Sequence, residues 1–197
     1  MVSRLWIGGG TCSGKSSLAR EIASATGRAP MTIDDSFNEH VALLPGSTLA
    51  RVAAMPVSER LAQSLEAQVD DVWAIAEERW SLVTATLADD GESTVVEGEA
   101  VLPSGLVGLD VSADFAVFLV VSPVTRRERY ARRQWARELV AGCADPDAAF
   151  EAWMRRDDLV QERIVSEAAV HGFRVFDADA PDRLAAAHAL LTGPATA

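Results

Sequence analysis

Residues 9–16 read Gly-Gly-Thr-Cys-Ser-Gly-Lys-Ser and match the spacing G-x-x-x-x-G-K-[ST]. An apolar run at 5–7 comes before them and an amphipathic segment from Ser17 comes after, which predicts a strand, a loop and a helix. In such a loop, successive backbone N–H groups point to one centre, and the helix N-terminus adds partial positive charge. A glycine-rich turn that only joins strand and helix is the alternative, but the spacing and both flanks favour a site for a di- or triphosphate.

Lys15 is the only lysine in the chain, whereas arginine occurs 17 times. Because a compact ammonium suits a phosphate cradle better than a flat guanidinium, this usage favours a phosphate-binding role for Lys15. We expect Lys15 to reach the β- and γ-phosphates of ATP and to be catalytic, and we expect Ser16 to bind Mg²⁺. The expected nucleotide contacts in the loop are Gly9, Gly10, Thr11, Cys12, Ser13, Gly14, Lys15, Ser16 and Ser17.

The composition is that of a globular protein, because 49% of the 197 residues are hydrophobic and 24% are charged. We expect a single domain over residues 1–197. The net charge of −11 argues against binding a nucleic acid by general attraction, although small anions can bind where arginines gather. The apolar start is too short for a signal peptide or a membrane span, so we expect a cytoplasmic protein with no membrane partner. Cys12 and Cys143 are too few for a disulfide framework and are expected to be free thiols.

Acidic residues follow two β-prone segments of the sequence. Asp34 and Asp35 come directly after residues 31–33, and Glu97 ends residues 95–97. Ligands of open parallel α/β sheets bind beyond the carboxyl ends of the strands, so these carboxylates are expected near the γ-phosphate. We expect Asp34 and Glu97 at the magnesium ion, where Glu97 would hold a water or help to orient the attacking group. An aspartate turn or cap, and for Glu97 a simple strand-end charge, are the alternatives.

A serine and a proline at positions 122 and 123 begin a helix that is rich in arginine. Nine of the arginines fall between positions 126 and 163, and those at 126, 129, 133 and 137 share one face of the expected helix. We expect residues 126–158 to form a lid that closes over ATP. In it Arg126 would bind the nucleotide, and Arg129 and Arg133 would stabilise the transferred charge. A merely solvated helix, paired through its glutamates, is the alternative.

Two further stretches are expected to face the ligands. Residues 37–75 are expected to line the acceptor pocket. Their first part is expected to be irregular or weakly helical, and a helix is expected over about 59–88. An apolar stripe on that helix includes Trp73 and Trp80 and is expected mainly in the core, with a place beside the acceptor as the alternative. Near the end of the chain, a strand at 173–176 runs into Asp177 and Asp179, in a turn that is expected to edge the adenine.

These segments alternate as strands and helices, which predicts a three-layer α/β/α sandwich with about five parallel strands. The chain resembles the P-loop small-molecule kinases, and within these P-loop NTPases it is most like the uridine kinase and phosphoribulokinase group. The matching residues are Asp35-Ser36-Phe37, Val95-Val96-Glu97-Gly98 and Arg129-Tyr130-Ala131-Arg132-Arg133. Chloramphenicol phosphotransferase-like kinases share the same skeleton. The resemblance implies that Asp35 is the base for an acceptor hydroxyl, that Glu97 assists at the metal and that the arginines at 126–133 form the lid.

Together these features predict an ATP- and Mg²⁺-dependent kinase that transfers the γ-phosphoryl group to a hydroxyl of a small molecule, such as a nucleoside or a sugar. An antibiotic- or nucleotide-sugar-modifying kinase is one alternative, and an ATP-binding regulator or ATPase without an acceptor is another. A guanine-reading Asn-Lys-x-Asp motif is excluded because Lys15 is the sole lysine. The choice of base among Asp34, Asp35 and Glu97 is open at this stage. So are the acceptor and the oligomeric state, for which a homodimer is one option.

Overall fold

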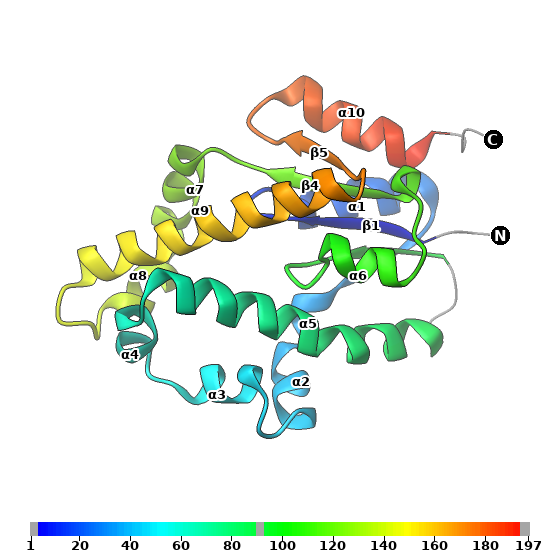
Figure 1. Cartoon of the computed structure of the whole chain (residues 1–197). Helices are drawn as coiled ribbons and strands as arrows, with labels where there is room; N and C mark the ends of the chain where they lie inside the picture. Colours follow the sequence, from blue (N-terminus) through cyan, green and yellow to red (C-terminus); the bar gives the residue numbers. More distant parts are fainter. Residues whose placement is uncertain (1–3, 90–92, 194–197) are drawn as a thin grey trace.

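The computed structural model describes residues 4–89 and 93–193 and contains a five-stranded sheet whose strand pairs are all parallel (Figure 1). The strands lie in the order β2-β3-β1-β4-β5. Their bounds are β1 Leu5–Gly9, β2 Ala29–Thr32, β3 Thr94–Glu97, β4 Ala116–Val120 and β5 Arg174–Asp177. In the central register, Ile7 pairs with Glu97 on one side and with Val117 on the other. The predicted α/β fold with about five parallel strands is confirmed.

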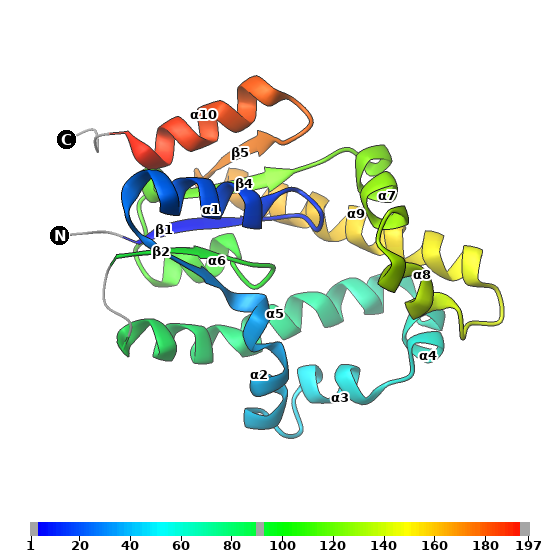
Figure 2. The same ribbon diagram turned by 180° about the vertical axis from the view of Figure 1, so that it is seen from behind.

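Helices cover both faces of this sheet (Figure 1 and Figure 2). Helices α1 (Lys15–Thr26) and α10 (Pro181–Thr192) lie on one face, and α5 (Leu65–Asp89), α6 (Pro103–Gly108) and α9 (Pro146–Val170) lie on the other. Side chains alternate across a strand, so Leu5 and Ile7 pack toward α1 and α10 while Trp6 packs toward α5. This alternation produces the three layers. Among the described residues, no helix is both long and apolar enough to cross a membrane.

Strand β2 ends earlier than the sequence predicts. Ile33, expected in the strand, instead begins the 3₁₀-helix η1 (Ile33–Ser36) and is buried. Its carbonyl oxygen accepts a hydrogen bond from Nη2 of Arg79 on α5 at 2.7 Å. In a continued strand this carbonyl would accept a hydrogen bond from the neighbouring strand, whereas at the bend it accepts one from a side chain. The bend carries Asp34 to the carboxyl edge of the sheet.

Short helices fill the segment that was expected to be irregular or weakly helical. They are α2 (Phe37–Leu43), α3 (Thr48–Ala54) and α4 (Val57–Ala62), and they lie below α5 in Figure 1. The prediction of one helix over 59–88 is wrong at its start, because the Ser64 hydroxyl accepts from the backbone N–H of Ala67 at 3.2 Å and marks a new helix start. The carboxylate of Glu78 ties α3 to α5, since it accepts from the first N–H groups of α3 at Thr48 and Leu49 at 2.8 and 2.9 Å.

The arginine-rich segment forms two helices rather than one, α7 (Pro123–Ala131) and α8 (Gln134–Val140). Arg133 is the N-cap of α8 and has an extended backbone, with φ −94° and ψ 111°. The predicted shared face of four arginines is therefore wrong, because Arg133 and Arg137 do not continue the helix that holds Arg126 and Arg129. The two helices pack with α4 and α9 around a small apolar cluster of Leu61, Tyr130, Ala136, Val140, Trp153 and Met154.

Candidate active site

The loop between β1 and α1 has the backbone that a phosphate-binding loop requires. Gly14 is the N-cap of α1 and has a left-handed φ of 91°, which glycine adopts without strain. Gly9 has a φ of 122°, and a Cβ added there would lie 2.0 Å from the carbonyl oxygen of Leu119. Only glycine fits at that position. The loop is thereby fixed as a close turn in front of the first turn of α1.

Lys15 lies at the base of this loop and is only 7% exposed. Its ammonium Nζ donates to the carbonyl oxygens of Gly10 at 2.9 Å and Gly9 at 3.3 Å. Ser16 and Ser17 follow in the first turn of α1 and are exposed. The ammonium and the helix N-terminus therefore present positive charge at one place, as an anion site requires.

Two cavities of similar size open at this edge of the sheet. The first, named here the phosphate cavity, has a volume of about 540 Å³. It is lined by Cys12, Ser13, Gly14, Lys15, Ser16, Ser17, Arg20, Asp34, Glu97, Glu99, Arg129, Arg133, Ala178 and Leu184. The loop residues Gly9, Gly10 and Thr11, also expected to contact the nucleotide, line a separate small cavity instead.

The second, named here the lateral cavity, has a volume of about 530 Å³. It is lined by Asp34, Phe37, Val52, Arg60, Gln68, Asp71, Val72, Ile75, Ala76, Arg79, Glu99, Ala100, Trp135 and Arg156. Asp34 and Glu99 line both cavities. These two carboxylates therefore stand where the phosphate cavity and the lateral cavity meet.

Of the two neighbouring aspartates, the structure brings Asp34 to this junction. Its Oδ1 lies 3.5 Å from Nη1 of Arg79, and its Oδ2 accepts from the backbone N–H of Glu99 at 3.3 Å. Asp35 is exposed and lines neither cavity. The geometry thus favours Asp34 over Asp35 as the carboxylate that faces both sides.

Glu97 ends β3 and is 1% exposed. Its Oε1 is buried and has no hydrogen-bond partner within the described ranges of the chain. Mg²⁺ prefers oxygen ligands and completes its shell with water and substrate phosphates, so an orphaned carboxylate oxygen in the wall beside Ser16 and Asp34 fits such an ion. No group of three His, Cys, Asp or Glu side chains in the described part of the chain could hold a metal, so an ion here would need the phosphate oxygens.

Glu99 is a site residue that the sequence reasoning missed. The available signal was a second acidic residue, two positions after Glu97, but the prediction stopped at Glu97 at the end of the strand. Its side chain is exposed toward the two cavities that it lines, and the partial removal of its carboxylate from bulk water, with the nearby charge of Asp34, raises its pKa to about 7. A carboxylate with such a pKa, placed in a cleft, is a candidate for proton transfer.

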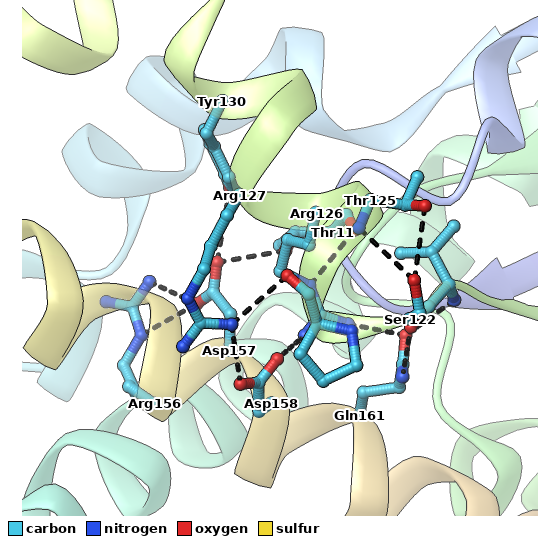
Figure 3. Close-up of polar contacts among 12 residues, drawn as sticks. Thr11, Ser122, Thr125, Arg126, Arg127, Tyr130, Arg156, Asp157, Asp158 and Gln161 are labelled. Atoms are coloured by element: carbon cyan, nitrogen blue, oxygen red, sulfur yellow. Dashed lines mark hydrogen bonds and ion pairs between the residues drawn. The ribbon is translucent and has the colours of Figure 1, made fainter.

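Arg126, expected to bind the nucleotide, is instead part of the buried framework (Figure 3). Its side chain is 0% exposed and makes an ion pair with Asp158 and a hydrogen bond with Oε1 of Gln161. Its Nε lies 3.5 Å from the carbonyl oxygen of Thr11. Arg126 does not line the phosphate cavity, so the prediction of a nucleotide contact is replaced by a structural role between α7, α9 and the loop.

Two other arginines of the predicted lid do reach the phosphate cavity. Arg129 donates from Nη1 to the carbonyl oxygen of Cys12 at 2.6 Å, and Arg133 lies over the rings of Tyr130 and Trp135 at 5.5 and 5.9 Å. Both line the cavity beside Lys15. They stand where negative charge on a nucleotide would need to be balanced.

Asp157 on α9 joins the phosphate loop to the arginine-rich helices. Its Oδ2 accepts hydrogen bonds from the hydroxyl of Thr11 at 2.9 Å and from the hydroxyl of Tyr130 at 3.2 Å (Figure 3). Its Oδ1 accepts from Nε and Nη2 of Arg156 at 2.9 and 2.6 Å. Burial and the charge of Asp157 raise the pKa of Tyr130, which keeps the phenol protonated as a donor. Sequence reasoning could not single out Asp157, because Thr11 and Tyr130 lie far from it in the chain.

The acidic turn after β5 holds the chain rather than facing the cavity directly. Oδ2 of Asp179 accepts from the backbone N–H of Ser122 at 2.9 Å, and Oδ1 of Asp177 accepts from the N–H of Asp179 at 2.9 Å. Burial opposes ionisation of Asp179, but the hydrogen bonds from Ser122 outweigh it and lower the pKa. Between the two carboxylates, Ala178 lines the phosphate cavity. The turn thus lies beside the phosphate cavity, and a contact of Asp177 or Asp179 with the nucleotide stays a prediction.

Comparisons with known proteins agree with the fold described above. Among solved structures, 127 chains match. Shikimate kinase from Bacteroides thetaiotaomicron is similar with a TM-score of 0.54 at 14% identity, over 94% of each chain. Shikimate kinase from Aquifex aeolicus vf5 is similar with a TM-score of 0.49 at 12% identity, over 96% of each chain. No protein-family model and no curated protein matches. At 14% identity, the likeness to the Bacteroides thetaiotaomicron enzyme shows the fold alone, and a grouping with uridine kinase and phosphoribulokinase gains no support from it.

Proposed function

We propose that this chain is an ATP-dependent kinase that transfers the γ-phosphoryl group to a hydroxyl of a small molecule. The observation that carries the proposal is that Asp34 and Glu99 line both the phosphate cavity and the lateral cavity. A triphosphate bound on the loop would extend its terminal phosphoryl toward these carboxylates, and an alcohol in the lateral cavity would meet it there. Phosphoryl transfer needs such an in-line approach above all else.

The donor side has the charges that this reaction requires. Lys15 and the N-terminus of α1 are placed for the β- and γ-phosphates, and Arg129 and Arg133 line the same cavity from the arginine-rich segment. The fold that this chain shares with proteins named shikimate kinases supports the same reading. Ser16 and Glu97 are the residues that would hold Mg²⁺, directly or through water, whereas Asp34, also expected at the ion, is assigned to the acceptor side. When bound, the ion would neutralise charge on the transferring phosphoryl group.

On the acceptor side, we assign Asp34 the role of orienting the hydroxyl and taking its proton. Arg79 and the backbone N–H of Glu99 hold the carboxylate of Asp34 in place from two directions. Glu99 is the second candidate, because it lines the same two cavities and its pKa is raised to about 7. Asp35 is the third candidate, because the resemblance of Asp35-Ser36-Phe37 to the uridine kinase group implies this role.

The proposal is tested with ATP labelled on the γ-phosphate and a library of nucleosides, sugars, hydroxy acids and hydroxyl-bearing antibiotics. A product that gains one phosphoryl group supports a kinase, whereas ADP and free phosphate as the sole products would make the chain an ATPase or a regulator. The Lys15→Ala variant is the control, because labelled products that persist in it come from a contaminant. Asp34→Asn and Asp35→Asn form a matched pair that identifies the carboxylate in use.

A further inference from the structure

One face of α5 forms a long wall of the lateral cavity. Its lining residues are Gln68, Asp71, Val72, Ile75, Ala76 and Arg79, which recur at steps of three and four and so share a face. Arg79 and Ala76 lie at the end near Asp34 and Glu99, while Gln68 and Asp71 lie toward the start of the helix. Eight residues of helix separate Ala76 from Gln68, a rise of roughly 12 Å. The cavity is therefore much longer than a compact sugar or hydroxy acid.

Several side chains that line the lateral cavity are apolar. They include Phe37, Val72, Ile75 and Trp135, of which Phe37 and Trp135 are 36% and 49% exposed. Large aromatic side chains gain free energy when a ligand covers them, at about 25 cal/mol for each Å² of apolar surface removed from water. A cavity of about 530 Å³ with apolar walls and a few polar groups has the character of a site for a ring-bearing molecule.

Polar atoms without partners cluster at the far end. Gln68 is 2% exposed, and its Nε2 donates to the carbonyl oxygens of Gln63 at 3.0 Å and Leu61 at 3.4 Å, which fixes the amide and leaves Oε1 without a hydrogen bond in the described structure. Oδ1 of Asp71 accepts from Arg51, while its buried Oδ2 has no such partner. Each buried polar atom that lacks a hydrogen bond lowers stability by about 1–3 kcal/mol.

A donor lies in the same wall. Nε of Arg60 is also buried without a hydrogen bond to any described residue, and burial followed by the charge of Arg156 lowers the pKa of Arg60. Gln68, Asp71 and Arg60, which carry these two acceptor oxygens and this N–H donor, all line the lateral cavity, and because the three atoms are covered by protein, a ligand reaches them where these side chains turn toward the cavity. A primary amide, which has N–H donors beside a carbonyl acceptor, is the simplest group that can bond to both the acceptor oxygens and the N–H donor.

We propose that the acceptor is an alcohol with an apolar ring body and, at the end remote from its hydroxyl, an amide-like edge that bonds to Gln68, Asp71 and Arg60. The proposal rests on the proposed kinase function and names its substrate class. The hydroxyl would lie at Asp34, the rings between α5 and the side chains of Phe37 and Trp135, and the amide at the far wall. Compact polyols and small hydroxy acids would leave these apolar side chains uncovered.

The test uses synthetic probes that differ in one feature. The first is 4′-(hydroxymethyl)biphenyl-4-carboxamide, which carries a hydroxymethyl group and a primary amide at opposite ends of two rings. Its N,N-dimethyl amide lacks the N–H donors, and glucose and shikimate are compact controls. Binding to the protein with ADP and Mg²⁺ is measured by calorimetry, and transfer from ATP by mass spectrometry. We expect the primary amide to bind at least about tenfold more tightly than the dimethyl amide, the effect of one hydrogen bond.

The variant Asp71→Asn separates recognition from folding. Arg51 donates to Oδ1 of Asp71, so in the asparagine variant the amide oxygen should stay at that position. The amide nitrogen then replaces Oδ2, which changes the orphaned acceptor into a donor. The preference for the primary amide should then fall to about twofold or less. The matched control is Asp70→Asn, because Asp70 is the exposed neighbour and pairs with Arg163 at 3.3 Å. It should keep the full preference.

The outcomes distinguish this inference from the proposed function. Binding of the primary amide with the expected preference, but without transfer, would support the ligand class and count against the kinase. Transfer to glucose or shikimate at an efficiency equal to that of the biphenyl probe would keep the kinase and overturn the inference. Absence of binding by the biphenyl carboxamide, or an unchanged preference in Asp71→Asn, would overturn it as well.

Discussion

Replacing Arg126 by methionine should destabilise the protein through the charge that it leaves behind. Methionine keeps much of the buried volume but removes the guanidinium that pairs with Asp158, whose side chain is 4% exposed. The same substitution removes the donor to Gln161. Breaking a buried ion pair on one side typically costs about 3–5 kcal/mol, because the remaining charge has lost its compensation.

The structure places the expected cost at the low end of that range. Nη1 of Arg127 lies 3.2 Å from Oδ2 of Asp158 and can compensate in part, so we expect about 3 kcal/mol of the free energy of unfolding to be lost. For a chain of 197 residues this corresponds to a fall in Tm of roughly 6–12 °C. Urea unfolding, followed by tryptophan fluorescence, gives the free energy, and calorimetry gives the Tm.

Two further variants make the result decisive. Arg132→Met is the matched control, because Arg132 is 80% exposed and pairs only loosely with Glu128 at 3.9 Å, so it should change stability by about 0.5 kcal/mol or less. The double variant Arg126→Met, Asp158→Leu removes both charges and should cost less than Arg126→Met alone. If Arg126→Met were as mild as Arg132→Met, the buried framework role would be refuted and the nucleotide contact expected from the sequence would regain its place.

The remaining predictions concern the chemistry. Lys15→Ala should lose both ADP binding, measured by calorimetry, and turnover; unchanged binding would contradict its place in the phosphate cavity. Asp34→Asn should keep ADP affinity within a few-fold and lower turnover by roughly 10²–10⁴, whereas the exposed Asp35→Asn should stay near the parent; the reverse order would restore Asp35 as the base. Because the pKa of Glu99 is about 7, turnover that depends on its anion should fall below that pH, whereas Glu99→Gln should turn over more slowly and show no such limb in the pH–rate profile. In the folded state Glu99 keeps its proton up to about pH 7, whereas in the unfolded chain it loses it near pH 4.5. The contribution of Glu99 to the free energy of unfolding should therefore decline as the pH rises between these values. Identical pH dependence of stability in the parent and in Glu99→Gln would contradict the raised pKa.

The fold and the phosphate loop could be predicted from the sequence because their signals are local. The glycine positions, the strand before them and the helix after them all lie within a short window, and Gly9 and Gly14 adopt the backbone that the spacing demands. The parallel sheet follows from the regular alternation of apolar segments. Each of these features is decided by near neighbours along the chain.

The lateral cavity could not be predicted in this way, because tertiary contacts decide it. The periodic pattern of arginines looked like one helix face, but the chain turns at Arg133, and the burial of Arg126 depends on Asp158 and Gln161 on another helix. The choice between Asp34 and Asp35 depends on where Arg79 reaches the bend after β2. No spacing along the chain carries that information.

Asp157 links the phosphate loop to the wall of the lateral cavity. One of its oxygens holds Thr11 of the phosphate loop, and the other holds Arg156, which lines the lateral cavity. A molecule that draws Arg156 toward itself would loosen or tighten the grip on Thr11, so filling one site would change affinity at the other. Thermodynamics requires this effect to be equal in both directions. Cooperativity between the two ligands would thus be carried by a single carboxylate, without any large movement of the helices above it.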